Sequence, residues 1–321
     1  MSFRRYVKTM EYIHKPVLLD ECIKELNIKS NGVYVDCTLG GAGHSKAIAG
    51  LLGKGGLLIG IDQDLEAVEH SRGVLDSLDY SKERVRIVSA SFFDVKQLLN
   101  VMGIYMVDGF LVDLGVSSFQ LDEPRRGFTY RSHDAPLDMR MNVKSTISAH
   151  DVVNYYDEKE IAEILWKYGE ERWAKRIAEF IVKDRPVETT GQLVSIIKKA
   201  IPAGAREGTS HPAKRSFQAI RIEVNKELEP LADALGDMAQ LLAPRGRLCV
   251  ISFHSLEDRI VKNSMRSLEG QCSCPKGFPI CVCRPKKVLR PITKRPILPS
   301  DIELENNNRA RSAKLRVAEK L

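Results

Sequence analysis

A glycine-rich turn and two acidic residues are the first features whose spacing suggests chemistry. Residues 38–45 (TLGGAGHS) follow an apolar run that ends at Asp36, and Asp62 ends the next apolar run, 19 residues after Gly43. Glycines let backbone N–H groups approach a ligand closely. A carboxylate at the end of a strand can accept hydrogen bonds from ribose hydroxyls. The pattern therefore predicts a site for a nucleoside cofactor.

The same turn does not fit a dinucleotide. The fingerprint G-x-G-x-x-G fails, because the third glycine position, counted from Gly41, holds Lys46. A glycine turn flanked by Asp36 and Asp62 instead suits S-adenosylmethionine, which has no phosphate but offers an amino-acid head and a ribose. Phe92, just after the third apolar run, is placed either to stack on the adenine or to pack in the core.

Asp113, at the end of a fourth apolar run, is the candidate catalytic residue. Amino-group methyltransferases carry an Asp or Asn here, followed by two prolines and an aromatic residue; the acidic residue is present and the prolines are not. An exocyclic amine such as cytosine N4 is a poor nucleophile. A carboxylate and a carbonyl that accept its two protons would localise its lone pair and offset the developing charge. The alternative is that Asp113 only begins a turn.

The elements that position these residues follow an alternating β/α order. Between short apolar runs lie segments long enough for crossover helices, which predicts an α/β, doubly wound, Rossmann-like sheet. The runs lie at residues 32–37, 57–62, 85–88, 109–113, 247–252 and 314–318.

The long interval between the fourth and fifth runs is helical in pattern. Ile161, Ile164, Leu165 and Tyr168 have helical spacing, and Gly169 is placed to end that helix. A second stripe runs over residues 173–181, before Pro186. A third helix begins at Thr190 as its cap and ends before Pro202. The interval predicts an all-helical domain inserted into the α/β domain.

Composition narrows the class of protein. The 321 residues are 43% hydrophobic and 28% charged, which is typical of a globular protein. The sequence contains no apolar stretch of about 20 residues and no secretory signal pattern, so we expect a soluble, cytoplasmic protein with no membrane contact. The net charge is +7, and residues 259–321 hold 15 Lys/Arg against 5 Asp/Glu. This basic end indicates a polyanionic partner or only aids solubility.

Seven cysteines in a chain without a signal argue against a disulfide framework. Cys272, Cys274, Cys281 and Cys283 form two C-x-C pairs that either bind zinc or remain reduced thiols, since the usual zinc spacing is C-x-x-C. We assign no metal ligand.

Several long runs carry a family resemblance. They include HKPVLLDE from His14, the loop from Asp36 to Ser45, VDLGVSSFQLDEPRRGFTY and DAPLDMRM between Asp108 and Met141, YGEERWAKRIA from Tyr168, HPAKRSFQAIRIEVNKELE from His211, ISFHSLEDRIVK from Ile251 and RARSAKLRVAE from Arg309. In these runs the chain resembles the ribosomal small-subunit methyltransferase H family, also called MraW, over nearly its whole length.

The resemblance implies a class I methyltransferase that uses S-adenosylmethionine. Its expected reaction is methylation of the N4 amino group of a decoding-region cytosine in 16S ribosomal RNA, within the small ribosomal subunit. It implies a methyltransferase domain in two parts, 1–127 and 212–321, around a helical insertion at 128–211 that forms the far wall of an RNA cleft. A homodimer is one option for its assembly.

The resemblance also assigns site residues. It places Asp113 against the cofactor, the target amine or both. The expected cofactor-binding residues are Ala42, Gly43, His44, Asp62, Phe92, Asp113 and Gln120. The residues expected to hold RNA phosphates near the target, or otherwise to form structural ion pairs, are Arg140, Lys214, Arg215, Arg221 and His254.

Three other functions are weighed against this one. A DNA amino-methyltransferase is disfavoured by the missing prolines. A non-catalytic RNA-binding assembly factor is disfavoured by the intact loop from Gly40 to Gly43 together with Asp62. A nicotinamide oxidoreductase is disfavoured by the failed fingerprint.

Overall fold

Seven strands form one sheet in the computed structural model, which describes residues 16–78, 84–205, 211–270 and 287–321. The sheet order is β3-β2-β1-β4-β5-β7-β6; β1 to β5 pair in parallel, and β7 is antiparallel to both of its neighbours. The strands are β1 Val33–Asp36, β2 Leu57–Asp62, β3 Val85–Ser89, β4 Val107–Asp113, β5 Leu242–Ser252, β6 Leu289–Pro291 and β7 Lys314–Lys320. This confirms the predicted Rossmann-like class I methyltransferase fold.

The sheet differs from the prediction at its edge and in one strand start. β6, which pairs only with β7, was not predicted; it has three residues and ends in Pro291, so it carries little strand pattern. β5 begins at Leu242, five residues before the predicted run, because its first half includes Pro244 and Gly246 and reads as a turn.

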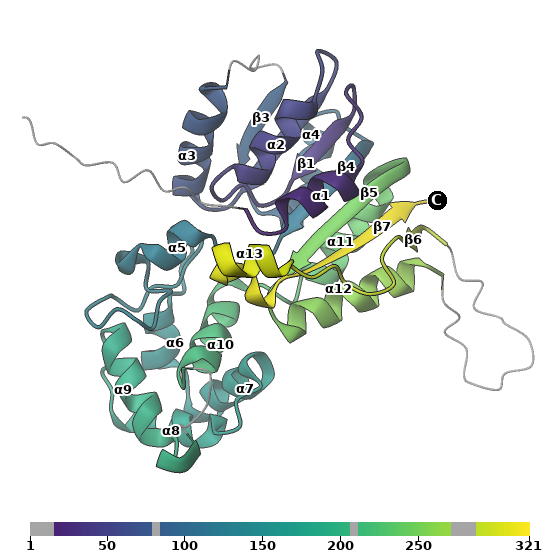
Figure 1. Ribbon diagram of the computed structural model, residues 1–321. Helices are drawn as coiled ribbons and strands as arrows, with labels where there is room; N and C mark the ends of the chain where they lie inside the picture. The colour runs from purple at the N-terminus through teal and green to yellow at the C-terminus, as the bar shows by residue number, and fades with distance from the viewer. Residues whose placement is uncertain (1–15, 79–83, 206–210, 271–286) are drawn as a thin grey trace, which may run out of the picture.

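Helices cover both faces of the sheet (Figure 1). One face is buried against α4 (Val95–Val101), α11 (Leu231–Leu241) and α12 (Ser255–Leu268). The other is buried against α1 (Leu19–Leu26), α2 (Gly43–Leu51) and residues of the C-terminal segment. The central strands are apolar on both faces, as parallel strands covered on two sides must be. α3 (Leu65–Asp76) packs beside β2 and β3.

A second unit, whose described elements are helices, lies below the sheet unit in Figure 1. Its helices are α6 Ala149–Tyr155, α7 Glu158–Gly169, α8 Ala174–Lys183, α9 Thr190–Ala200 and α10 Lys214–Asn225. The predicted helical stripes fall on α7, α8 and α9, and α7 ends at Gly169 as expected. Thr190 does not cap α9: Thr189 does, accepting a hydrogen bond from Gln192 N, while the Thr190 hydroxyl donates to the Ser132 carbonyl.

The apolar core of the helical unit runs from Phe128 to Leu228. The boundary expected at residue 211 falls just before α10, but α10 packs on α7 and shares its core. The reason is a buried stripe on α10 that includes Phe217, Ile220 and Val224.

The C-terminal segment returns to the sheet edge where β1 and β4 end. It comprises α13 (Asp301–Asn306), η4 (Asn308–Ser312) and β7. Glu303 accepts a hydrogen bond from the backbone N–H of Leu18 at 2.8 Å, and Arg309 forms an ion pair with Asp122 of α5 (Ser118–Asp122). The end of the chain therefore holds both the N-terminal segment and α5 in place (Figure 1).

Within the described ranges, no helix combines the length and apolar character needed to cross a bilayer.

Candidate functional site

The carboxyl ends of β1, β2 and β4 meet at one edge of the sheet, where ligands bind in doubly wound folds. The loop after β1 is tied to both neighbouring strands. The N–H of Leu39 donates to the carbonyl of Ile61, and the N–H of Asp113 donates to the Thr38 hydroxyl at 2.7 Å. The glycine-rich loop, Asp62 and Asp113 are thus brought together as the sequence predicted.

Asp62 is oriented by two backbone donors. Gly40, which adopts φ +49°, donates its N–H to Oδ2 of Asp62 at 2.9 Å, and the N–H of Asp64 donates to Oδ1 at 2.9 Å. Burial raises the pKa of Asp62 to about 6, although these two hydrogen bonds oppose the shift. Each carboxylate oxygen retains a second lone pair, which is the acceptor that a ribose hydroxyl requires.

The start of α2 is shaped for close backbone approach. Ala42 precedes the helix in the left-handed region at φ 61°, and Gly43 is the first helical residue. A Cβ on Gly43 would lie 2.1 Å from Cγ of Pro16, so only glycine fits beneath the N-terminal segment. The requirement explains why the turn carries a glycine here and why residues 16–18 can lie against it.

Asp36 stabilises the glycine-rich loop through hydrogen bonds. It is fully buried, and its carboxylate accepts hydrogen bonds from the Ser45 hydroxyl at 2.6 Å and from the Thr38 N–H at 3.2 Å. Burial raises its pKa to about 7 against these bonds. These contacts hold both ends of the glycine loop.

Asp113 is the least satisfied carboxyl of the site. Its Oδ1 is buried and has no hydrogen-bond partner in the described part of the chain, and its Oδ2 lies 4.0 Å from Nδ1 of His44. Burial, with the negative charges of Asp36 and Glu257 nearby, raises the pKa of Asp113 to about 8. A buried acceptor without a donor is rare in folded proteins and calls for a functional explanation.

His44, Phe92 and Gln120 surround this edge. His44 is buried within α2 and its Nε2 lies 3.0 Å from the carbonyl of Val17. Phe92 begins η1 (Phe92–Asp94) directly after β3, is half-buried and packs partly against the sheet core. Gln120 lies in α5, where it forms a capping box with Ser117, and its amide donates to Oδ2 of Asp64 at 2.7 Å.

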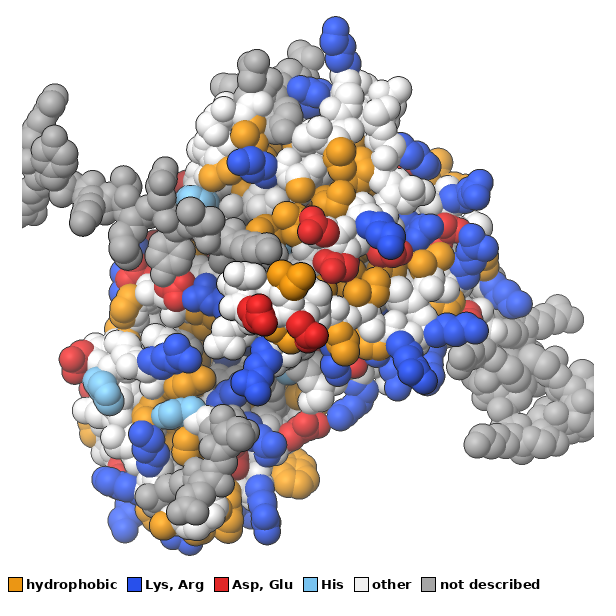
Figure 2. Space-filling model, in the orientation of Figure 1, with side chains coloured by type: hydrophobic (Ala, Val, Ile, Leu, Met, Phe, Trp, Pro, Cys, Tyr) orange, Lys and Arg blue, Asp and Glu red, His pale blue; other side chains and the backbone are white. Residues whose placement is uncertain are grey.

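The predicted RNA-contacting residues differ in their surroundings. Lys214 and Arg215 are exposed at the start of α10, although Arg215 also donates to the carbonyl of Glu170. Arg140 forms a two-pronged ion pair with Asp138 and donates to the carbonyl of Ser145. In the view of Figure 2, lysine and arginine side chains are spread over the helical unit as well as the sheet unit.

Arg221 and His254 belong to a buried ionic cluster. Arg221 pairs with Glu227 through bonds of 2.9 and 2.8 Å, and its Nη2 lies 3.9 Å from Glu257. His254 caps α12, and its Nε2 lies 3.0 Å from Glu257 Oε1. Burial would raise the pKa of Glu257, but His254 and Arg221 outweigh it and lower that pKa. The cluster joins α10 to the start of α12, so both side chains face inward.

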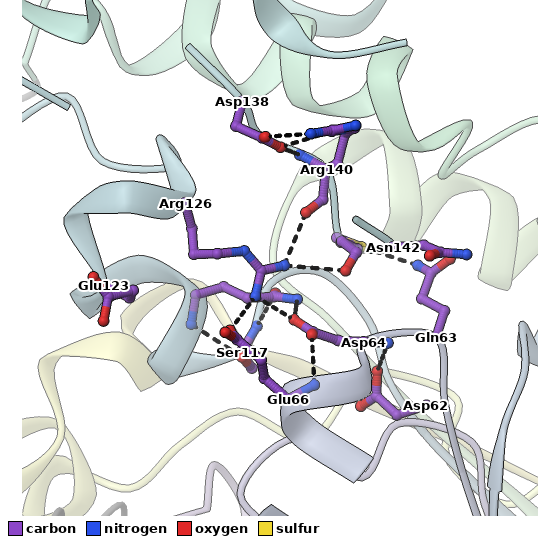
Figure 3. Close-up of polar contacts among 12 residues, drawn as sticks. Asp62, Gln63, Asp64, Glu66, Ser117, Glu123, Arg126, Asp138, Arg140 and Asn142 are labelled. Atoms are coloured by element: carbon purple, nitrogen blue, oxygen red, sulfur yellow. Dashed lines mark hydrogen bonds and ion pairs between the residues drawn. The ribbon is translucent and has the colours of Figure 1, made fainter. Parts of the chain in front are cut away.

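Sequence reasoning missed one set of buried polar residues, which Figure 3 shows. Arg126, at the end of η2 (Pro124–Arg126), lies 2.8 Å from both Asp64 and Glu66. Asp64 caps α3 and accepts from Glu66 N at 3.1 Å. The available signal was the adjacent pair Arg125–Arg126 before Gly127, but spacing alone does not tell which arginine is buried.

No cluster of three or more histidine, cysteine or acidic residues suited to a metal occurs among the described residues. Cys272, Cys274, Cys281 and Cys283 lie outside that part of the chain. The described cysteines, Cys22, Cys37 and Cys249, are buried free thiols.

Comparisons with known proteins identify relatives over nearly the whole chain. A family model described as the MraW methylase family matches residues 11–321. Curated relatives named ribosomal RNA small subunit methyltransferase H include that of Clostridioides difficile strain 630, 54% identical over 315 residues, covering 97% of this chain and 100% of the relative. The protein of that name from Brevibacillus brevis is 54% identical over 316 residues, covering 98% and 99%.

Solved structures show a more distant likeness. An rRNA methylase from Streptococcus thermophilus aligns with a TM-score of 0.41 and 10% identity, covering 96% of this chain and 98% of that one. The N-methyltransferase NodS from Bradyrhizobium japonicum aligns with a TM-score of 0.41 and 7% identity, covering 94% and 93%.

Proposed function

The chain belongs to the MraW methylase family, and from this premise we propose that it methylates 16S ribosomal RNA at the N4 amino group of a decoding-region cytosine. Support for the RNA class comes from the relatives named as small-subunit RNA methyltransferases. Support for the amino group comes from one observation, the buried and unpartnered Oδ1 of Asp113 at the carboxyl end of β4.

The site residues fit S-adenosylmethionine. Asp62 holds open lone pairs for the ribose hydroxyls, and the turn at Ala42, Gly43 and His44 would line the amino-acid head. Phe92 follows β3 at the position for the adenine, and Gln120 fixes the Asp62–Asp64 turn from the α5 side. When bound, this cofactor supplies a methyl group activated on a cationic sulfur.

Asp113 performs the step that the amine needs. Its Oδ1 accepts one N–H of the cytosine amino group, which draws the nitrogen lone pair out of the ring and toward the methyl donor. As the N–C bond forms, the bond between the methyl carbon and the donor sulfur would break and leave its electron pair on sulfur, and the positive nitrogen loses that proton to the carboxylate. A pKa of about 8 makes Asp113 a competent proton acceptor near neutral pH. Alignment of the reacting atoms supplies the rest, and the chain forms no covalent bond to the base.

The helical unit forms the second wall for RNA. Lys214 and Arg215, exposed at the N-terminal end of α10, contact phosphates in this proposal. Arg140, Arg221 and His254 sit in internal ion pairs, so they act by fixing the strap at residues 138–141 and the start of α12 that the RNA meets. RNA bases reach such a pocket by leaving the stack.

A methyl-transfer assay tests the proposal. The protein would be incubated with radiolabelled S-adenosylmethionine and, in parallel, 16S RNA, small ribosomal subunits and DNA. We expect label in an RNA sample and none in DNA. Asp113→Asn is expected to lose at least a hundredfold in rate, while Asp233→Asn, at an exposed position of α11, keeps the wild-type rate. Label on DNA alone, or an active Asp113→Asn variant, would overturn the proposal.

A further inference from the structure

Arg126 is a buried cation at the junction between the cofactor loop and the helical unit. Its side chain is 5% exposed, and Nη1 lies 2.8 Å from Oδ2 of Asp64 and 2.8 Å from Oε2 of Glu66. Nη2 donates to the backbone carbonyls of Arg140 and Met141 at 2.9 and 3.0 Å. Figure 3 shows the guanidinium between the start of α3 on one side and the strap of residues 138–141 on the other.

On the sheet side, Arg126 contacts Asp64, which in turn contacts Asp62, the proposed acceptor for the ribose. Asp64 receives the guanidinium and the Gln120 amide on one oxygen, and its backbone N–H donates to Oδ1 of Asp62. Asp64 is almost fully buried. Without the cation, two carboxylates would face each other beside Asp62, and their repulsion would move the turn that orients Asp62.

On the helical side, the strap is fixed to α10. Asn225, the last residue of α10, accepts a hydrogen bond from the N–H of Met141 at 2.7 Å and donates its amide to the carbonyl of Met139 at 2.8 Å. Arg126 adds a backbone contact, since its carbonyl accepts from the N–H of Met139. A continuous set of hydrogen bonds therefore joins Asp62 to the helix that begins with Lys214 and Arg215.

We propose that Arg126 is a positioning residue that couples the two binding sites, so that a cofactor bound at Asp62 tightens RNA binding on the helical unit. Such coupling is reciprocal: RNA must raise the affinity for the cofactor by the same factor. The coupled ligands are those of the proposed function, on which this inference rests. Arg126 touches neither ligand and acts through Asp64 on one side and the strap on the other.

The test measures affinities rather than turnover. Calorimetry gives the Kd of S-adenosylhomocysteine, and filter binding gives the Kd of a small-subunit RNA fragment with and without S-adenosylhomocysteine. We expect the wild type to bind RNA at least threefold more tightly when the cofactor product is present. Arg126→Gln is expected to weaken S-adenosylhomocysteine binding at least tenfold and to abolish this enhancement, and Arg126→Lys to retain part of both.

Two further variants keep the test decisive. Arg125→Gln removes the same charge from the neighbouring residue, which is exposed and also contacts Glu66, and is expected to behave as wild type. Asn225→Ser cuts the strap from α10 without touching the cofactor turn, so it should bind S-adenosylhomocysteine normally yet lose the enhancement. If Arg126→Gln fails to fold, Asn225→Ser and Arg126→Lys still test the coupling.

The coupling would be overturned if S-adenosylhomocysteine still enhanced RNA binding fully in Asn225→Ser. It would also be overturned if Arg126→Gln bound S-adenosylhomocysteine with a Kd within threefold of the wild-type value. A wild type that binds both ligands independently would overturn it as well. These outcomes are separate from failure of the proposed function, in which the wild type would bind no S-adenosylhomocysteine or would leave the RNA unmethylated.

Discussion

Nδ1 of His44 lies 4.0 Å from Oδ2 of Asp113, while Nε2 of the same ring lies 3.0 Å from the carbonyl oxygen of Val17. Because a carbonyl only accepts, Nε2 carries the hydrogen of this contact. The ring lies beside Oδ2, while Oδ1, which has no hydrogen-bond partner in the described part of the chain, is left to receive a proton from an incoming amine.

Methyl transfer is expected to depend on pH through Asp113. The reactive form is the carboxylate, and burial raises the pKa of this group to about 8. The rate at limiting S-adenosylmethionine should therefore fall about tenfold per pH unit below that pKa and level off above it. At saturating S-adenosylmethionine the positive sulfur favours the carboxylate, so the profile should shift to lower pH. Rates measured from pH 5.5 to 9.5 on intact RNA check this, and a flat profile would contradict it.

Asp113→Asn should make the unliganded protein more stable at alkaline pH. A carboxyl whose pKa is higher in the folded state than in the unfolded state stabilises the fold below its unfolded pKa, and that contribution is lost as the pH rises through about 8. Asparagine stays neutral and avoids the loss. We expect Tm of the variant to exceed that of the wild type by about 2 °C or more at pH 8.5.

The difference should shrink as the pH falls and nearly vanish below about pH 4, where Asp113 is protonated in both the folded and the unfolded state. Asp36 and Asp62 are present in both proteins, so their contributions to the pH dependence of Tm cancel in the comparison. A variant that is equally destabilised at both pH values would show that Asp113 has a structural role instead.

Gly43→Ala should damage both folding and cofactor binding. The new Cβ would meet Cγ of Pro16 at 2.1 Å, so the N-terminal segment must move away from the loop. We expect a loss of about 1–3 kcal/mol in the free energy of unfolding and weaker S-adenosylhomocysteine binding by calorimetry. Gly73→Ala in α3 is the matched control, since nothing lies near its Cβ; it should stabilise the protein by up to about 1 kcal/mol.

Lys214→Ala should weaken RNA binding in a salt-dependent way. A lysine that neutralises one phosphate releases one counterion, so its loss should reduce the slope of log affinity against log salt by about 0.7 for single-stranded RNA. Lys54→Ala removes an equal charge in the turn before β2, at the opposite edge of the sheet, and should leave the slope unchanged. Equal slopes for both variants would show that Lys214 does not contact an RNA phosphate.

The edge of the sheet that carries the proposed cofactor site could be predicted, because the order of the strands along the chain determines which residues meet there. In a parallel sheet the residues after β1, β2 and β4 meet at one edge, so Asp36, Asp62 and Asp113 could be grouped from the apolar runs alone. The need for glycine near position 43 could also be inferred from the glycine-rich turn. Its cause could not, because Pro16 lies 27 residues away and its position depends on packing.

The polar contacts between the two units could not be predicted. Sequence spacing shows that a residue is basic, but not whether its partner is a phosphate or a carboxylate. The sequence left open whether Arg221 holds a phosphate or forms an ion pair, and its partners include Glu257, which follows it by 36 residues. Arg126 and Arg125 are neighbours of the same type, and only the fold buries one and exposes the other.

The most direct test of the proposed reaction identifies the modified nucleoside. Small ribosomal subunits and 16S RNA, isolated from cells that lack this gene, would be incubated with the protein and S-adenosylmethionine, digested to nucleosides and analysed by mass spectrometry. We expect N4-methylcytidine at a single position, formed by the wild type and not by Asp113→Asn. A methyl group on carbon 5 of cytosine, on a ribose hydroxyl or on another base would contradict it.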